Sequence, residues 1–472
     1  MPTTRSQAKR SRLPDIGQRV GINRLPPEIL SAIFVACDRI WRHHEEPGWD
    51  KSKCRAILST ICSYWRKVAI DTTALWTRIV LSLYPPWHFT KICLTRAGPT
   101  ALLDIELNME IDIYCDTESN EEKNLDRLVG TAEDALAFIA NYGGGPSRWR
   151  TLSSKTNVFL VQLAVMKLFG KYLSPSLTSV EMQRRGTFEF GYDDQYRLNS
   201  EVKSEPKMLF REPPLVLRSI KLRGVPGTYL FGHSRPQFVA LTHLELCFEI
   251  FHPKLADFHK LLAANPRLET IRLSSRSTFD PVIIDEGRLP SIYLPQLRSL
   301  SFILVASSWT LRTIMMLDVS NVTSLELILG VVSFQDRLGE EAGIRELLAH
   351  IIGDENQAPP TPCFSSLKSL TLASEMTPDF EDDLTAVLAS HPQITELTLP
   401  SCPSFGPLLR RPWQAPDIEY LRVGSNDLAQ LKEVVNSRRK AGLPLRTVRV
   451  GRFARVANGW QSDRKYDLFA CM

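Results

Sequence analysis

The strongest pattern in this chain is a short phrase of apolar residues that returns nine times beyond residue 210. Each phrase has the form apolar-x-x-apolar-x-apolar. Side chains alternate between the two faces of a strand, so the last two apolar positions share one face and predict a strand buried on that side. The nine phrases are Leu217/Ile220/Leu222, Leu241/Leu244/Leu246, Leu268/Ile271/Leu273, Leu297/Leu300/Phe302, Val322/Leu325/Leu327, Leu367/Leu370/Leu372, Ile394/Leu397/Leu399, Ile418/Leu421/Val423 and Leu445/Val448/Val450.

Amphipathic stretches between the phrases predict helices that alternate with these strands. The middle residues of successive phrases lie 24 to 29 positions apart, except for one interval of 45. The predicted fold class is therefore α/β, a solenoid of parallel strands and helices that curves like a horseshoe. A doubly wound sheet is the alternative, but it requires a reversal of strand order. The predicted helices span Leu255–Ala264, Leu311–Leu317, Ile344–Ile352, Phe380–Ala389 and Leu428–Ser437.

Units of one strand and one helix, 20 to 29 residues long, resemble leucine-rich repeats. The asparagine that is typical of that family after the last leucine is missing, since Arg223, Ser274 and Ser374 stand there. We assign residues 211–472 to this domain, with 460–472 as its cap. Residues 83–210 are interpreted as irregular first repeats or a linker. They contain expected strands at Leu102–Leu107, Trp149–Leu152 and Leu177–Met182.

The first 82 residues have a different pattern. Residues 1–20 are polar and basic, which predicts a disordered tail. In residues 21–82, two apolar stripes follow helical spacing and are related by a shift of 28 positions. They predict a pair of amphipathic helices with more apolar surface than the pair can bury, closed by a turn and a strand near Leu75–Val80. The stripes are Ile29, Leu30, Ile33, Phe34, Cys37, Ile40, Trp41 and Ile57, Leu58, Ile61, Cys62, Trp65, Val68, Ala69.

Three motifs in this region resemble the F-box in the form found in fungal F-box-like proteins. They are Leu25–Leu30 (Leu-Pro-Pro-Glu-Ile-Leu), Ile61–Ala69 and Leu75-Trp76. The resemblance implies that residues 21–82 dock on a Skp-type adaptor and, through it, join a cullin ubiquitin ligase. The adaptor-binding residues that it implies are Leu25, Pro26, Ile29, Leu30, Ile33, Phe34, Leu58, Cys62 and Trp65.

Polar residues beside the middle apolar position of each phrase are expected on the open face of the repeat sheet. A protein target is the expected partner there, through polar contacts and a few anchors. The charges on this face are mixed, which disfavours a nucleic-acid groove. The candidate target-binding residues are Lys221, Arg223, His243, Glu245, Arg272, Glu326, Tyr420, Arg422 and Arg449.

Composition adds few constraints. Apolar residues make up 43% of the chain, charged residues 23%, and the net charge is +5, values that are ordinary for a globular protein. The sequence has neither an apolar run long enough to span a bilayer nor the apolar segment of a signal peptide. Its nine scattered cysteines are interpreted as reduced. We therefore expect a cytoplasmic or nuclear protein that does not bind membranes.

Motifs for catalysis are missing from the sequence. We find no Gly-x-Ser-x-Gly elbow, His-Glu-x-x-His helix or paired-cysteine zinc spacing, and we interpret His43–Glu46 as a solvated loop. Together with the role that the resemblance to the F-box implies, this leads us to expect a non-catalytic substrate receptor of a ubiquitin ligase, with no metal or cofactor. Two alternatives stay open: a repeat scaffold that binds an adaptor without directing ubiquitin transfer, and an enzyme with a site among the repeat loops.

Overall fold

The computed structural model forms two compact units, each described separately below. The helical unit comprises Met1–Arg78 and Lys91–Ala101, and the repeat unit comprises Ile79–Thr90 and Leu102–Met472. The tail predicted to be disordered and the loop His43–Glu46 lie outside the described residues. The structure describes residues 22–42, 53–110, 121–184, 192–249, 251–275, 289–330, 337–353, 362–374, 380–401, 404–424, 427–443, 445–451, 453–456, 459–462 and 466–470.

The first predicted helix of the helical unit is confirmed. It begins at Pro27, where a missing N–H costs no intrahelical bond, and Glu28 suits the positive end of the helix dipole. The next three helices along the chain pack against it, and the last of them occupies the position of the turn predicted near Leu75. The elements are a 3₁₀ turn Ile22–Arg24, α1 Pro27–Arg42, α2 Lys53–Leu58, α3 Ser63–Asp71, α4 Thr73–Trp76 and most of α5 His88–Ala97.

The second predicted helix is wrong as a single element, because the chain breaks between α2 and α3. The Ser59 hydroxyl donates to the Arg55 carbonyl (2.8 Å) and the Thr60 hydroxyl to the Ile57 carbonyl (2.8 Å). The side chain of Cys62 then accepts from the backbone N–H of Trp65 and begins α3. The hydroxyls thus add hydrogen bonds to carbonyls at the end of α2, and the thiol pairs a backbone N–H at the start of α3.

All nine predicted strands of the repeat unit are confirmed, and the three expected before residue 210 belong to the same sheet. Consecutive strands from β2 to β13 pair in parallel and in sequence order. Their bounds are β1 Arg78–Ser82, β2 Leu103–Met109, β3 Trp149–Thr156, β4 Ser179–Arg184, β5 Ser219–Arg223, β6 His243–Phe248, β7 Thr270–Ser275, β8 Ser299–Ile303, β9 Ser324–Leu329, β10 Ser369–Ser374, β11 Glu396–Leu399, β12 Tyr420–Val423 and β13 Thr447–Val450.

The register of the sheet follows the sequence phrase. The middle residue of each phrase is the Cα partner of the next one, from Ile220 through Leu244 to Val448. The long interval is no exception, because Leu325 and Leu370 are direct partners. Among the described strands β1 to β13 the order never reverses, which excludes the doubly wound alternative. The repeat unit therefore has a mixed α/β, solenoid-like fold.

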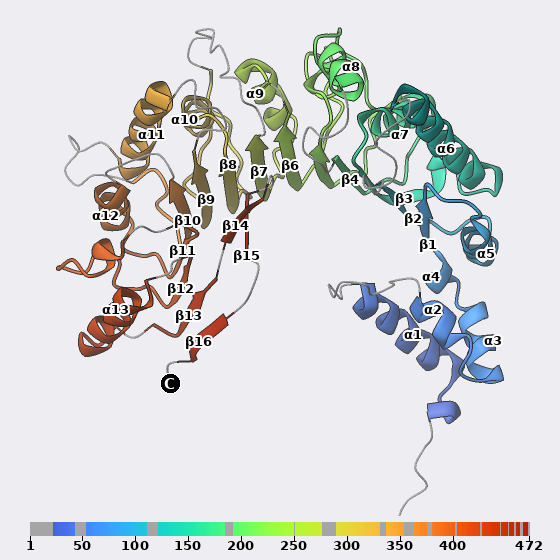
Figure 1. The fold of residues 1–472 in the computed structure, drawn as a ribbon, viewed down its shortest axis with the longest axis horizontal. Helices are drawn as coiled ribbons and strands as arrows, with labels where there is room; N and C mark the ends of the chain where they lie inside the picture. Colours follow the sequence, from blue (N-terminus) through green and yellow to red (C-terminus); the bar gives the residue numbers. More distant parts are fainter. Residues whose placement is uncertain are drawn as a thin grey trace, which may run out of the picture. The chain divides into compact units, whose positions relative to one another are not determined.

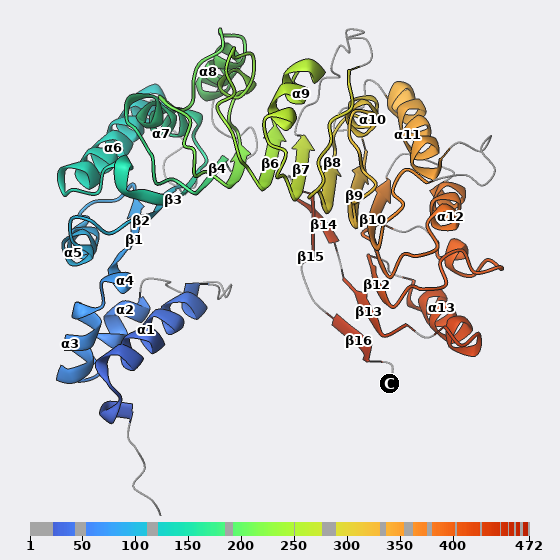
Figure 2. The same cartoon turned by 180° about the vertical axis from the view of Figure 1, so that it is seen from behind.

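Helices of the repeat unit cover one face of the sheet (Figures 1 and 2). The five predicted helices are confirmed, although α10 and α11 begin several residues earlier than expected. The interval of 45 is occupied by α11 and its flanking segments. The helices are α6 Glu121–Asn141, α7 Phe159–Lys171, α8 Tyr192–Val202, α9 Leu255–Ala263, α10 Ser307–Met315, α11 Arg337–Ile352, α12 Phe380–Ser390 and α13 Leu428–Lys440.

Three short strands follow the last repeat. β14 (Phe453–Val456) pairs antiparallel with β15 (Gly459–Ser462), and β16 (Tyr466–Ala470) pairs antiparallel with β13. β16 thus occupies the hydrogen-bonding edge of the last parallel strand, where an uncovered edge would invite pairing with another chain. Within the described part of the chain, the structure contains no helix with both the length and the apolarity needed to span a bilayer.

Buried polar side chains join successive repeats. Asn265, fully buried after α9, accepts from the backbone N–H of Leu241 (2.8 Å) and donates to the carbonyls of Phe238 and Leu261. Phe238 and Leu241 belong to the preceding repeat. Asn265 therefore satisfies backbone groups that no strand or helix pairs, at a position where water has no access.

We expect Asn265→Ala to lower the free energy of unfolding by about 1–3 kcal/mol, because it leaves buried backbone groups unpaired. Urea unfolding followed by circular dichroism measures the loss. Gln296→Ala, in the exposed loop before β8, is the control and should change stability by less than about 0.5 kcal/mol. Equal stability of the two variants would contradict the role assigned to Asn265.

Candidate functional site

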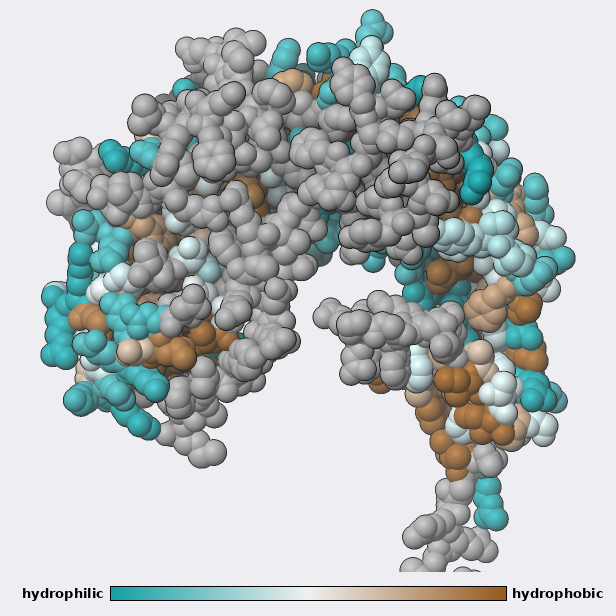
Figure 3. All heavy atoms as spheres, viewed as in Figure 1, coloured by the Kyte–Doolittle hydropathy of each residue, from teal (hydrophilic) through white to brown (hydrophobic). Residues whose placement is uncertain are grey.

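Helix α1 carries two apolar stripes, and the helical unit buries only one of them. Leu30 and Phe34 have no exposed surface, whereas Ile29 is 51% exposed and Ile40 is 72% exposed. Positions 29, 33, 37 and 40 follow one another along a single side of a helix. The exposed stripe of α1 is therefore Ile29, Ile33, Cys37 and Ile40, and Figure 3 shows apolar surface over this group of helices.

Two further isoleucines of the helical unit are exposed beside the break between α2 and α3. Ile57 is 46% exposed and Ile61 is 52% exposed. Both belong to the second stripe of the sequence, but the predicted adaptor-binding set omits them. Only the break at Ser59–Cys62 identifies them as surface residues, and the spacing of the stripe did not indicate that break.

The predicted adaptor-binding residues divide into surface and interior positions. Pro26 and Ile29 are exposed, while Leu25, Ile33, Cys62 and Trp65 are partly exposed. Leu30, Phe34 and Leu58 are buried in this structure, and their direct contact with an adaptor stays a prediction. Their physical role is to hold the helices together, as the ring of Phe34 does by packing 4.9 Å from that of Trp65.

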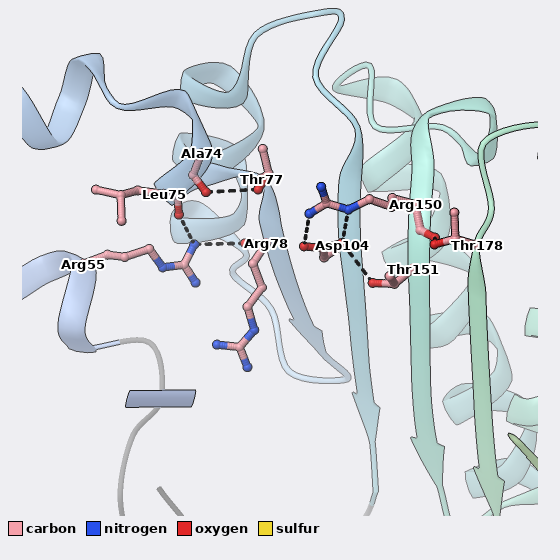
Figure 4. Close-up of polar contacts among 9 residues, drawn as sticks. All are labelled: Arg55, Ala74, Leu75, Thr77, Arg78, Asp104, Arg150, Thr151 and Thr178. Carbon is pink, nitrogen blue, oxygen red and sulfur yellow. Dashed lines mark hydrogen bonds and ion pairs between the residues drawn. The ribbon is translucent and has the colours of Figure 1, made fainter. Parts of the chain in front are cut away.

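A buried ion pair fixes the helices that present this surface. The side chains of Arg55 and Asp38 are each 1% exposed, and Arg55 Nε lies 3.7 Å from Asp38 Oδ1. Arg55 Nη1 also donates to the carbonyls of Leu75 (3.2 Å) and Arg78 (2.9 Å), as Figure 4 shows. The same nitrogen contacts Cys93 Sγ at 3.6 Å. Burial raises the pKa of the Cys93 thiol, although the positive charge of Arg55 opposes that rise.

A row of polar side chains crosses the open face of the repeat sheet, as predicted from strand alternation. Lys221, Glu245 and Arg272 are successive Cα partners, and Ser301 links Arg272 to Glu326 in the same row. Lys221 Nζ lies 3.2 Å from Glu245 Oε1, and Arg272 Nη1 lies 3.2 Å from Glu326 Oε2. These four charges therefore neutralise one another, which weakens the long-range attraction that they offer to a charged target.

The other predicted target-binding residues are spread along this face. Arg422 and Arg449 are Cα partners in the same row, and His243 and Tyr420 lie in the neighbouring row, two residues earlier in their strands. Tyr420 is 41% exposed. Whether these residues bind a target stays a prediction.

Arg223 is the least accessible of the predicted target-binding residues. It lies on the open face by alternation, yet it is only 9% exposed. The end of β5 is crowded: the next residue, Gly224, has a φ of +74°, and a Cβ there would lie 2.5 Å from the Cβ of Arg184. Sequence alternation alone did not indicate this burial, and target binding by Arg223 stays a prediction.

The described residues contain no group of three or more His, Cys, Asp or Glu side chains arranged to hold a metal ion. Compared with models of known protein families and with curated protein sequences, the chain matches none.

Proposed function

We propose that this chain is the substrate receptor of a Skp–cullin–F-box ubiquitin ligase. In this proposal the helical unit is an F-box that docks on a Skp-type adaptor. The repeat unit is a leucine-rich-repeat-like solenoid that holds a protein target. The observation that carries the proposal is the exposed stripe of α1, because an amphipathic helix normally turns its apolar side chains toward a core.

The energetics of docking are consistent with this surface. Burial of a large apolar side chain is worth roughly 1.5–3 kcal/mol. Ile29, Ile33, Ile40 and Ile57 are already partly buried in the free chain, so together they would contribute about 3–6 kcal/mol before the cost of association, which is estimated at about 4–15 kcal/mol. Net affinity requires helices that need no ordering on binding. The buried ion pair of Arg55 and Asp38 supports such preorganisation.

A receptor of this kind contributes to ubiquitin transfer by proximity. It raises the effective concentration of target lysines near the ubiquitin thioester and needs no catalytic group of its own. In this proposal the open sheet face presents the target with polar side chains that are fixed by their own ion pairs.

We expect Ile29→Glu with Ile40→Glu to weaken association with a Skp-type adaptor by at least about a hundredfold, because each change puts a charge into an apolar interface. Copurification of the adaptor with the full chain, followed by titration calorimetry, measures the effect. The control is Arg39→Glu, which adds negative charge at an exposed position of the same helix outside the stripe. This control should bind the adaptor with nearly wild-type affinity.

Failure of the wild-type chain to bind any Skp-type adaptor would overturn the proposal. Adaptor binding without recruitment of a cullin or formation of ubiquitin conjugates would instead support the interaction scaffold.

A further inference from the structure

A second surface lies in the repeat unit, on the loops that lead into β3, β4 and β5. These loops lie side by side: the backbone N–H of Thr178 donates to the Arg150 carbonyl, and that of Arg218 to the Thr178 carbonyl, both at 2.8 Å. The Thr178 hydroxyl also donates to the Arg150 carbonyl (2.9 Å), as Figure 4 shows. The Arg211 N–H likewise donates to the Phe169 carbonyl (3.0 Å). We call residues 142–148, 171–178 and 208–218 the entry rim.

The entry rim exposes several large apolar side chains to solvent. Leu177, Leu209, Phe210 and Leu217 of these ranges are buried in the core, but six other apolar side chains from all three loops are exposed. Large apolar side chains that gather at the surface indicate an interaction site more often than isolated ones do. They are Tyr142 (42% exposed), Tyr172 (40%), Leu173 (42%), Met208 (41%), Leu215 (72%) and Val216 (39%).

Positive charge accompanies these side chains. Lys171, Arg211 and Arg218 are exposed and form no ion pair with a residue that the structure describes, while Glu212 supplies one opposing charge. Arg211 Nη1 donates to the Lys171 carbonyl (3.5 Å), and Arg218 Nη1 to those of Leu215 and Ala240 (3.3 Å each). These contacts hold two guanidinium groups at the rim without neutralising them.

We propose that the entry rim binds an acidic protein segment with leucine or aromatic anchors. The cations would receive its carboxylates, and the apolar side chains would cover its anchors. Two of the six exposed apolar side chains, Tyr142 and Tyr172, are aromatic, but the other four are aliphatic and offer no stacking platform for bases. Charge and apolarity together therefore favour a protein partner.

One part of this inference rests on the proposed function: the idea that the acidic segment belongs to a target for ubiquitin transfer. Binding at the entry rim needs no adaptor, so the two proposals can fail separately. If the acidic segment binds and no adaptor does, only the receptor role fails.

The test uses the full chain and a fluorescein-labelled peptide in which Glu and Asp pairs alternate with Leu and Phe. Fluorescence anisotropy measures its affinity for the wild type and for two rim variants, Leu215→Ser with Val216→Ser and Lys171→Glu with Arg211→Glu. Matched controls on α13 are Leu428→Ser, at a side chain that is 44% exposed, and Lys432→Glu with Lys440→Glu. We expect each rim variant to lose at least about tenfold in affinity, about 1.4 kcal/mol, and the controls less than about twofold.

A second arm tests other partners. A peptide with Lys in place of the acids should not bind, nor should anionic vesicles or single-stranded RNA at the same salt concentration. Peptide binding that the rim variants leave unchanged would overturn the inference. The inference would also be overturned if the peptide does not bind while vesicles or RNA bind to the wild type and not to the rim variants. Adaptor copurification should be equal for all variants, which separates this result from the docking of the helical unit.

Discussion

Replacement of Arg55 by alanine is expected to destabilise the helical unit by about 3–5 kcal/mol, because it removes one partner of a buried ion pair. The substitution leaves the Asp38 carboxylate in the interior without its cation and takes a donor from the carbonyls of Leu75 and Arg78. We expect faster hydrogen–deuterium exchange throughout α1 to α4 in the full chain. Association with a Skp-type adaptor should fall in parallel, since the exposed stripe depends on ordered helices.

Two further variants make this expectation specific. Arg39→Ala, at an exposed position of α1, should leave exchange unchanged. Asp38→Leu combined with Arg55→Met should destabilise the unit less than Arg55→Ala alone, because apolar side chains can often replace a buried ion pair with little loss. Wild-type exchange in Arg55→Ala would show that the ion pair contributes nothing to order in the helices.

The repeat fold could be predicted from the sequence because strand register and phrase coincide. Each strand buries the same two positions of its phrase. Aligning the phrases therefore predicts which residues are neighbours across the sheet, from Ile220 through Leu244 to Val448. A slip by one residue would turn every apolar side chain of a strand to the wrong face. Residues that join repeats, such as Asn265, could not be predicted, because an isolated asparagine gives no sign of which backbone groups it will meet.

The candidate surfaces were predictable only in part. Helical spacing located the apolar stripes but could not say which half of each is buried, and so Leu30 and Ile29 received the same role. Likewise, alternation placed Lys221 and Arg223 on one face, but it carried no information about crowding at the strand end. The entry rim was missed because its residues come from three loops without any periodicity. Exposure depends on packing between distant segments, which a local pattern does not encode.

One histidine of the repeat unit is placed where it resists protonation. Both ring nitrogens of His252 are shielded from solvent and make no hydrogen bond within the described part of the chain. The ring lies 5.4 Å from that of Phe248 and 5.6 Å from that of Trp309. Burial lowers the pKa of His252 from 6.5 to about 4. The folded state therefore favours the neutral imidazole, whereas the unfolded chain protonates near the ordinary value.

This difference predicts a loss of stability in mild acid. The pKa of His252 is lower in the folded state than in the unfolded state. The contribution of the neutral imidazole to folding stability is therefore complete above pH 6.5 and is lost as pH falls toward about 4. Between pH 7.5 and 4.5 we expect a loss of about 2–3 kcal/mol from this residue. Urea unfolding of the wild type and of His252→Phe at both pH values measures it.

The phenylalanine variant keeps an aromatic ring among Phe248 and Trp309 and removes the titrating group. Between pH 7.5 and 4.5 this variant should lose about 2–3 kcal/mol less folding stability than the wild type. At pH 7.5 the stability of the two proteins should differ little. Burial also lowers the pKa of His391, so acid sensitivity should diminish in His252→Phe without disappearing. Equal losses in the two proteins would show that His252 does not couple protonation to folding.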